Sequence, residues 1–129
     1  MKKFAAALLL AVGIGASSIA GAGASFSYPV YVGTNIAYGS VRAARYSGNT
    51  RENISCNVYG ATNQGTVTTY VSCVATNANG TGWGCSTYSP SPQLVQAALA
   101  VSDSSYVIAQ SDSNYNCTYI YVSNNSGYL

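Results

Sequence analysis

The chain has 129 residues, which suits a single domain with a modest core. Only 6% of its residues are charged, for a formal net charge of +2 at pH 7, and both lysines stand at positions 2 and 3. Beyond them, three arginines balance three acidic residues, which is too little positive charge to neutralise nucleic-acid phosphates or to hold an anionic membrane surface. The composition therefore excludes nucleic acid and such a membrane as partners.

Residues 1–24 are typical of a cleavable secretory signal peptide of the bacterial kind. A short basic end precedes an apolar run rich in Ala and Leu, and Ala22-Gly23-Ala24 supplies the small residues of a cleavage site. A retained membrane anchor is the alternative, since about 20 apolar residues can span a bilayer. Glycines and serines interrupt the run, however. We therefore expect a mature chain that begins at Ser25, is secreted or periplasmic, and contacts no membrane after cleavage.

The first predicted strands of the mature chain are residues 28–32, which are mostly β-branched or aromatic, and residues 37–42. A longer alternating pattern follows. It predicts a hairpin that turns at Asn63-Gln64-Gly65 and buries one face, made of Ile54, Cys56, Val58, Val67, Val71, Cys73 and Ala75. A second turn at Asn79-Gly80 leads into a third strand over residues 83–88, so the three segments form a meander.

Four cysteines lie in the mature part, at Cys56, Cys73, Cys85 and Cys117. An even number in an oxidising compartment predicts two disulfides, each contributing about 2–4 kcal/mol. A zinc site is the alternative, but the cysteines are widely spaced and the chain has no histidine. We expect no metal and no cofactor. Of the three possible pairings, the meander favours Cys73 with Cys85 and Cys56 with Cys117, because Cys73 and Cys85 lie nearly opposite.

A single amphipathic helix follows the meander. Its apolar residues, Leu94, Val95, Ala98, Leu99 and Val101, have helical spacing, with Ser91 as the cap and Pro92 in the first turn. Two further strands are predicted over residues 105–109 and 118–123. We expect a mostly β (α+β) fold over residues 25–129: a small antiparallel sheet or sandwich of about 5–7 strands with one short helix and two disulfides.

Catalytic groups are scarce in the mature chain. It has no histidine and no lysine, so a general base at neutral pH would have to be Glu52, Asp103 or Asp112. The two aspartates flank the predicted strand at 105–109, which separates them by about 30 Å at about 3.3 Å per residue. We interpret them as turn or cap residues and expect no enzyme activity.

The only cluster of charge is formed by Arg42, Arg45, Arg51 and Glu52. If residues 42–45 are helical, the i,i+3 spacing places Arg42 and Arg45 on one face, where they can grip a carboxylate or a sulfate. If the segment is extended, they point to opposite faces. The alternative is structural: an arginine pairs with one of the acidic residues and fixes a loop to the domain.

Tyrosine is unusually frequent, with 12 in the chain. A tyrosine buries its ring while its hydroxyl stays in water, which suits thin sandwiches and binding surfaces. In the last strand, Tyr119 and Tyr121 alternate with Ile120 and Val122 and share a side with Cys117. If this cysteine is bonded, we expect the tyrosine face to be at least partly covered.

The single tryptophan, Trp83, lies between Gly82 and Gly84. Small neighbours leave an aromatic ring accessible to a flat ligand such as a sugar ring. The alternative is that Trp83, two residues before a cysteine, packs against a disulfide. We favour packing and keep Trp83 as a candidate for binding.

One order of features covers most of the mature chain: a cysteine in a strand, a hairpin to Val-Ser-Cys73-Val-Ala, Gly80, Cys85, a short helix, Asp103-Ser104, Cys117-Thr118-Tyr119-Ile120 and Asn125-Ser126. This order resembles that of an uncharacterised group of small exported bacterial proteins with four cysteines. The shared motifs are structural cysteines and strands, so the resemblance implies no activity and no functional residue.

We therefore expect a secreted or periplasmic non-enzymatic binding or adhesion module with an aromatic, hydroxyl-rich surface. The candidate ligand-binding residues are Trp83, Tyr119, Tyr121, Arg42 and Arg45, and the partner is a glycan, a cell-surface component or another exported protein. One alternative is a proteinaceous inhibitor of an exported enzyme, with a protruding loop such as Asn77 to Gly82. The other is a self-assembling surface component, since a near-zero charge favours self-association.

Overall fold

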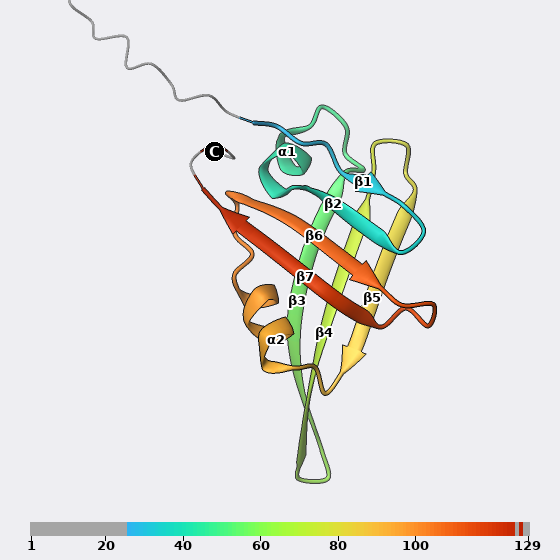
Figure 1. The fold of residues 1–129 in the computed structure, drawn as a ribbon, viewed down its shortest axis with the longest axis vertical. Coiled ribbons are helices and arrows are strands. Elements are labelled where there is room, and N and C mark those ends of the chain that lie inside the picture. Colours follow the sequence, from blue (N-terminus) through green and yellow to red (C-terminus); the bar gives the residue numbers. More distant parts are fainter. Residues whose placement is uncertain (1–25, 126, 128–129) are drawn as a thin grey trace, which may run out of the picture.

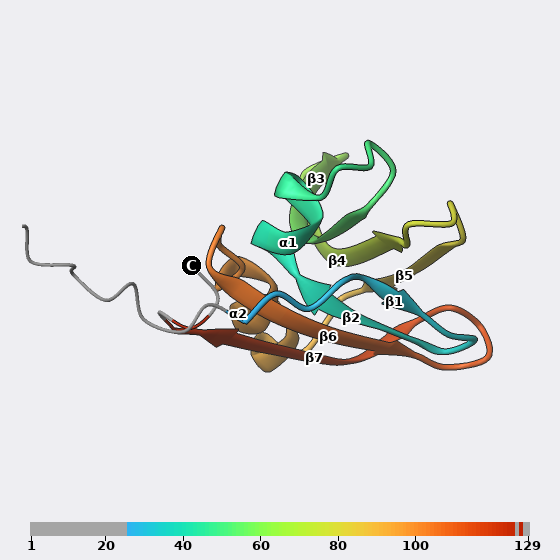
Figure 2. The ribbon, with the colours of Figure 1, turned by 90° about the horizontal axis from the view of Figure 1, so that it is seen from above.

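Two antiparallel sheets pack face to face in the computed structural model, which describes residues 26–125 and 127. Sheet A has the spatial order β1 (Tyr31–Val32), β2 (Ile36–Ser40), β6 (Ser105–Ser111) and β7 (Cys117–Asn124). Sheet B is the meander β3 (Asn53–Asn63), β4 (Thr66–Thr76) and β5 (Gly82–Tyr88). The strands of sheet A cross those of sheet B (Figure 1), and the side view separates the two layers (Figure 2). The mostly β class is confirmed; the predicted signal peptide at 1–24 lies outside the described residues.

Two helices cover the open sides of the sandwich, where the sequence predicted one. The predicted helix is α2 (Pro92–Leu99), whose first turn is capped by Ser91 and which contacts both β3 and β7. The second is α1 (Val41–Tyr46), over part of the predicted strand at 37–42. The Ser40 hydroxyl accepts a hydrogen bond from the Ala43 N–H, which ends β2 and starts the helix. In the described part of the chain, neither helix has the length and apolar character needed to cross a bilayer.

The core between the sheets is made of small side chains. Val71 and Cys73 of sheet B and Ala37, Val107 and Ala109 of sheet A are each at most 1% exposed. Because these side chains are small, each buries little apolar area. The two disulfides lie in the same buried cluster, so the covalent links and the core stabilise the same region.

The β3–β4 hairpin is longer than the core that it helps to form. Its turn residues Gln64 and Gly65 have positive φ of 48° and 82°, as the hairpin turns that match strand twist require. The distal half of the hairpin extends beyond the rest of the molecule (Figure 1). Val67, which the alternation predicts to be buried, is therefore 71% exposed.

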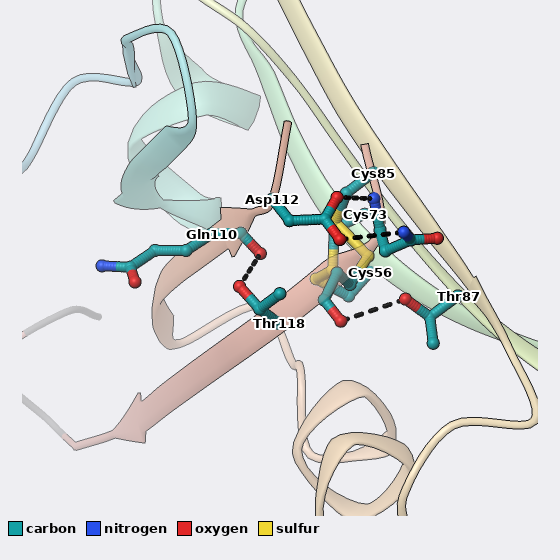
Figure 3. The surroundings of a disulfide bond; sticks show 9 residues. Cys56, Cys73, Cys85, Thr87, Gln110, Asp112 and Thr118 are labelled. Carbon is teal, nitrogen blue, oxygen red and sulfur yellow. Dashed lines mark hydrogen bonds between the residues drawn. A yellow bond between two sulfur atoms is a disulfide. The ribbon is translucent and has the colours of Figure 1, made fainter. Parts of the chain in front are cut away.

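The disulfides join Cys56 to Cys73 and Cys85 to Cys117, so the pairing favoured from the sequence is wrong. Cys73 does lie opposite Cys85 in the register, but Cys56 lies opposite it on the other side. The Cα–Cα distance of 4.0 Å between Cys56 and Cys73 is that of a close antiparallel pair. Cys85 is then bonded to Cys117, which comes from sheet A (Figure 3). Cys117 lies outside the meander, so the pattern of the meander alone cannot identify it as the partner of Cys85.

A β-bulge changes the orientation of β7. Ser111 pairs with Cys117 whereas Gln110 pairs with Tyr119, so Thr118 is an extra residue. An extra residue reverses the alternation of the strand that carries it. Cys117 is consequently buried on the same side as Ile120, while Tyr119 lies on the outer side. The prediction that the tyrosines share a side with Cys117 is therefore wrong.

A candidate aromatic binding face

A row of large side chains crosses the outer face of sheet A at one level. The strand register pairs Tyr31 with Tyr38, Tyr38 with Ile108, and Ile108 with Tyr121, which takes one residue from each of the four strands. The rings of Tyr31 and Tyr38 are stacked, with centroids 4.8 Å apart. These residues, together with Tyr28, Tyr106 and Tyr119, are called the sheet A aromatic face below.

A second group of rings extends the row toward the N-terminal segment. Tyr106 contacts Tyr28 edge to face at 5.2 Å and Tyr38 at 6.5 Å between centroids. The segment is fixed to β2 because the Ser40 N–H donates to the Tyr28 carbonyl. Close approach also requires Gly39, where a Cβ would lie 2.9 Å from the Val30 Cα. The rings are therefore held in place by the backbone beneath them.

The sheet A aromatic face is open and uncharged. Tyr28, Tyr31, Tyr119 and Tyr121 are 43–49% exposed, so each ring is half buried and half accessible. None of the four strands of sheet A, all of which are described, contains a charged residue. An extended exposed aromatic surface of this kind is typical of an interaction site, because soluble monomers rarely leave one uncovered. The arrangement suits a flat, neutral ligand with both apolar and hydroxyl surfaces.

Trp83 does not belong to this face. It is 9% exposed and is part of the buried cluster between the sheets, so its ring is no open platform. Its indole nitrogen is buried and has no hydrogen-bond partner among the described residues. The structure thus places Trp83 in the packed core between the sheets.

The two candidate arginines of α1 have separate contacts. Arg45 forms an ion pair with Asp103, and because both side chains are more than half exposed, the pair contributes at most about 1 kcal/mol. The Arg42 guanidinium lies 5.4 Å from the ring centroid of Tyr46. Arg42 also lines a hollow of about 350 Å³, but the Glu52 side chain lines the same hollow and opposes binding of an anion. The structure therefore does not bring Arg42 and Arg45 together on one ligand.

Each carboxylate among the described residues has a structural contact. Glu52 accepts a hydrogen bond from the Val30 N–H, and Asp103 pairs with Arg45. Asp112 caps the β6–β7 loop, as its position between turn residues predicted. Its Oδ1 accepts from the backbone N–H groups of Asn114 and Asn116, and its Oδ2 from the Asn116 side chain. These bonds, the Asn116 side chain first, lower the pKa of Asp112 below its ordinary value of 3.8.

Three sulfur atoms gather at one point in the described structure, those of Cys73, Cys85 and Cys117, all within 4.8 Å of one another. Metal binding by cysteine requires a thiolate. Because all three belong to disulfides, their proximity reflects the packing of one disulfide against the other. The arrangement offers no ligand set for a metal while the disulfides are intact.

Tyr119 and Tyr121 were found from the sequence as candidates, whereas Tyr31 and Tyr38 were not. Strand periodicity indicates which residues share a face of one strand but not which strands are neighbours. The β1–β2 pair is short, and β2 pairs with β6 across more than 60 intervening positions, so the local sequence pattern indicates little of this register.

No protein-family model, curated protein or solved structure matches the chain. The chemistry of the site therefore rests on its own residues.

Proposed function

We propose that the protein is an exported, non-enzymatic adhesion module that binds neutral glycans on the sheet A aromatic face. The observation that carries the proposal is the row formed by Tyr31, Tyr38, Ile108 and Tyr121 across four strands. The two disulfides agree with an oxidising compartment outside the cytoplasm, where such polymers are accessible.

Sugar rings and tyrosines have matching surfaces. A pyranose presents C–H groups on its faces, which pack on an aromatic ring, and hydroxyls at its rim, which bond to polar neighbours. Gln110 and Ser123 lie on the same outer side, paired with Tyr119 and Tyr106. Four strands at about 4.8 Å spacing make the row about 14 Å long, which suits an extended polymer better than a single sugar. Because the face is neutral, binding costs no desolvation of charge.

The test is co-sedimentation of the disulfide-bonded mature chain with insoluble neutral polysaccharides and with isolated cell walls. Tyr121→Ala removes one ring of the row. Since an aromatic contact contributes about 0.5–1.5 kcal/mol, we expect affinity to fall about 2- to 12-fold. Tyr46→Ala is the matched control, because Tyr46 is 72% exposed but lies on α1, away from the row. Equal binding by both variants and the wild type, or no binding by the wild type, would contradict the proposal.

A second candidate function is inhibition of an exported enzyme, and the shape of the β3–β4 hairpin favours it. The hairpin projects from the sandwich, as an inhibitory loop would (Figure 1). The loop suggested by the sequence, Asn77 to Gly82, is instead a tight turn in which the Asn77 side chain accepts from the Asn79 and Thr81 N–H groups. A stoichiometric complex with an exported hydrolase, lost when residues 61–68 are replaced by a two-residue turn, would establish this alternative.

A further inference from the structure

A second row of tyrosines crosses the outer face of sheet B. The register aligns Tyr59, Tyr70 and Tyr88 on its three strands, and neighbouring ring centroids are 5.0 and 5.5 Å apart. Since the two sheets pack through their inner faces, this row and the sheet A aromatic face lie on opposite sides of the molecule (Figure 2). One ligand surface therefore cannot account for both rows.

The row continues into a hollow of about 410 Å³, called the β5 groove below. Val74 and Gly84 contribute small surfaces to it, and Gly84 has no side chain that would fill it. No charged side chain lines the groove. The residues that offer rings, hydroxyls or amides to a ligand are Tyr88, Tyr115, Ser72, Ser86, Asn114 and Asn116. Such a lining suits a neutral polyhydroxylated molecule, through stacking and through hydrogen bonds to its hydroxyls.

The loop that forms one side of the groove is fixed before any ligand arrives. Asp112 holds the backbone of Asn114 and Asn116, and the Tyr115 carbonyl accepts a hydrogen bond from the Ser86 N–H of β5. The Thr87 hydroxyl donates to the Cys117 carbonyl, beside the disulfide that joins β5 to β7 (Figure 3). A groove with preset walls loses little conformational entropy on binding.

Tyr115 occupies a backbone position that does not favour it. Its φ is +61°, in the left-handed region where glycine and asparagine are accommodated more easily than a bulky residue. Its side chain is 68% exposed, so the ring gives the fold little packing in return. Packing within the fold therefore does not explain a bulky ring at this position, and the ring lines the β5 groove.

We propose that the β5 groove is a second saccharide-binding site, and that the protein cross-bridges two neutral glycan chains held on its opposite faces. Binding in the groove stands by itself, whereas the bridging rests on the proposed function of the sheet A aromatic face. Two sites on one rigid body raise the effective concentration at the second site once the first is filled. The protein thus acts as a linker within a polysaccharide layer.

The groove is tested with Tyr115→Asn, because asparagine tolerates the left-handed backbone. Isothermal titration with soluble neutral hexasaccharides, of β-linked glucose and of β-linked N-acetylglucosamine, measures the affinity. We expect Tyr115→Asn to weaken binding about tenfold at the groove while the melting temperature stays equal or rises, and Tyr115→Phe to keep wild-type binding. Wild-type affinity in Tyr115→Asn, or failure of the wild type to bind either probe, overturns the second site.

Bridging is tested by agglutination of beads coated with the same saccharides. The wild type is expected to agglutinate them, whereas Tyr115→Asn and the double variant Tyr31→Ala/Tyr121→Ala each bind beads without agglutinating them. If Tyr115→Asn still agglutinates, the groove is not the second site, although sheet A binding survives. If the double variant retains full binding and agglutination, the sheet A proposal fails and the groove does not. A wild type that is a dimer in sedimentation without saccharide also overturns bridging by the monomer.

Discussion

At the scale of the residue, two kinds of side chain shape this surface. Tyrosines such as Tyr31 and Tyr121 supply rings that are half accessible and carry no charge. Asp112 plays a different part, because it positions the loop that contains Tyr115. The sequence predicted Asp112 as a turn residue, because aspartate beside serine and asparagine is typical of such turns. The sequence pattern did not indicate that this loop exposes the ring of Tyr115.

We expect Asp112→Asn to lower the melting temperature slightly, because an amide nitrogen cannot accept the hydrogen bond from the Asn116 side chain. The pKa of Asp112 in the folded protein is below its ordinary value of 3.8, so the stabilisation by its carboxylate is fully present above that pH. It is lost as the pH falls below 3.8 toward the folded pKa. The difference in melting temperature between wild type and variant should narrow over this acidic range. A difference that stays constant as the pH falls would contradict the role given to Asp112.

At the scale of the element, the two disulfides have different tasks. Cys56–Cys73 links neighbouring strands of one hairpin, which the β3–β4 ladder already holds together. Cys85–Cys117 links sheet B to sheet A. It also closes the longer loop, with a sequence separation of 32 residues against 17. Longer loops restrict the unfolded chain more, so the second disulfide should contribute more to stability.

We expect the variant Cys85→Ala/Cys117→Ala to lose about 4 kcal/mol of unfolding free energy, and Cys56→Ala/Cys73→Ala about 3 kcal/mol. In Cys85→Ala/Cys117→Ala, the covalent link between the sheets is also lost. This adds to the loss of unfolding free energy, because fewer contacts then hold the β5 edge to sheet A. Urea unfolding of both double variants measures the difference. A larger loss in the hairpin variant would contradict this assignment.

The elements themselves were largely predictable, while their neighbours were not. Alternation located β3, β4 and β5, and helical spacing with Ser91 and Pro92 located α2. Three features depend on contacts between distant segments: the disulfide partner of Cys85, the bulge at Thr118 and the row across sheet A. Local pattern contains the period of a strand but not its register with a strand many residues away. The sequence therefore predicted only part of the candidate site, namely Tyr119 and Tyr121.

At the scale of the whole molecule, the balance of charge and the placement of the tyrosine rows both suit a neutral ligand. Beyond residue 24 the chain has as many arginines as acidic residues, and Arg45 pairs with Asp103. Two aromatic rows then lie on opposite outer faces of a sandwich that disulfides hold together. A rigid body with two uncharged aromatic surfaces is suited to contacts with neutral polymers.

Binding to glycans should accordingly be insensitive to ionic strength, because no charged side chain lies on sheet A or lines the β5 groove. Co-sedimentation at low and at high salt measures this directly. A steep loss of affinity with salt would indicate instead an anionic ligand held by an arginine such as Arg42, and would move the site to α1.

Glycan binding on the sheet A aromatic face is tested most directly by tyrosine footprinting by nitration, followed by mass spectrometry, with and without a bound neutral polysaccharide. We expect Tyr31, Tyr119 and Tyr121 to be protected when the glycan is bound. Tyr46, on α1, should react equally in both states. Protection of Tyr46 alone, or equal reactivity of all these tyrosines with bound glycan present, would contradict binding on the sheet A aromatic face.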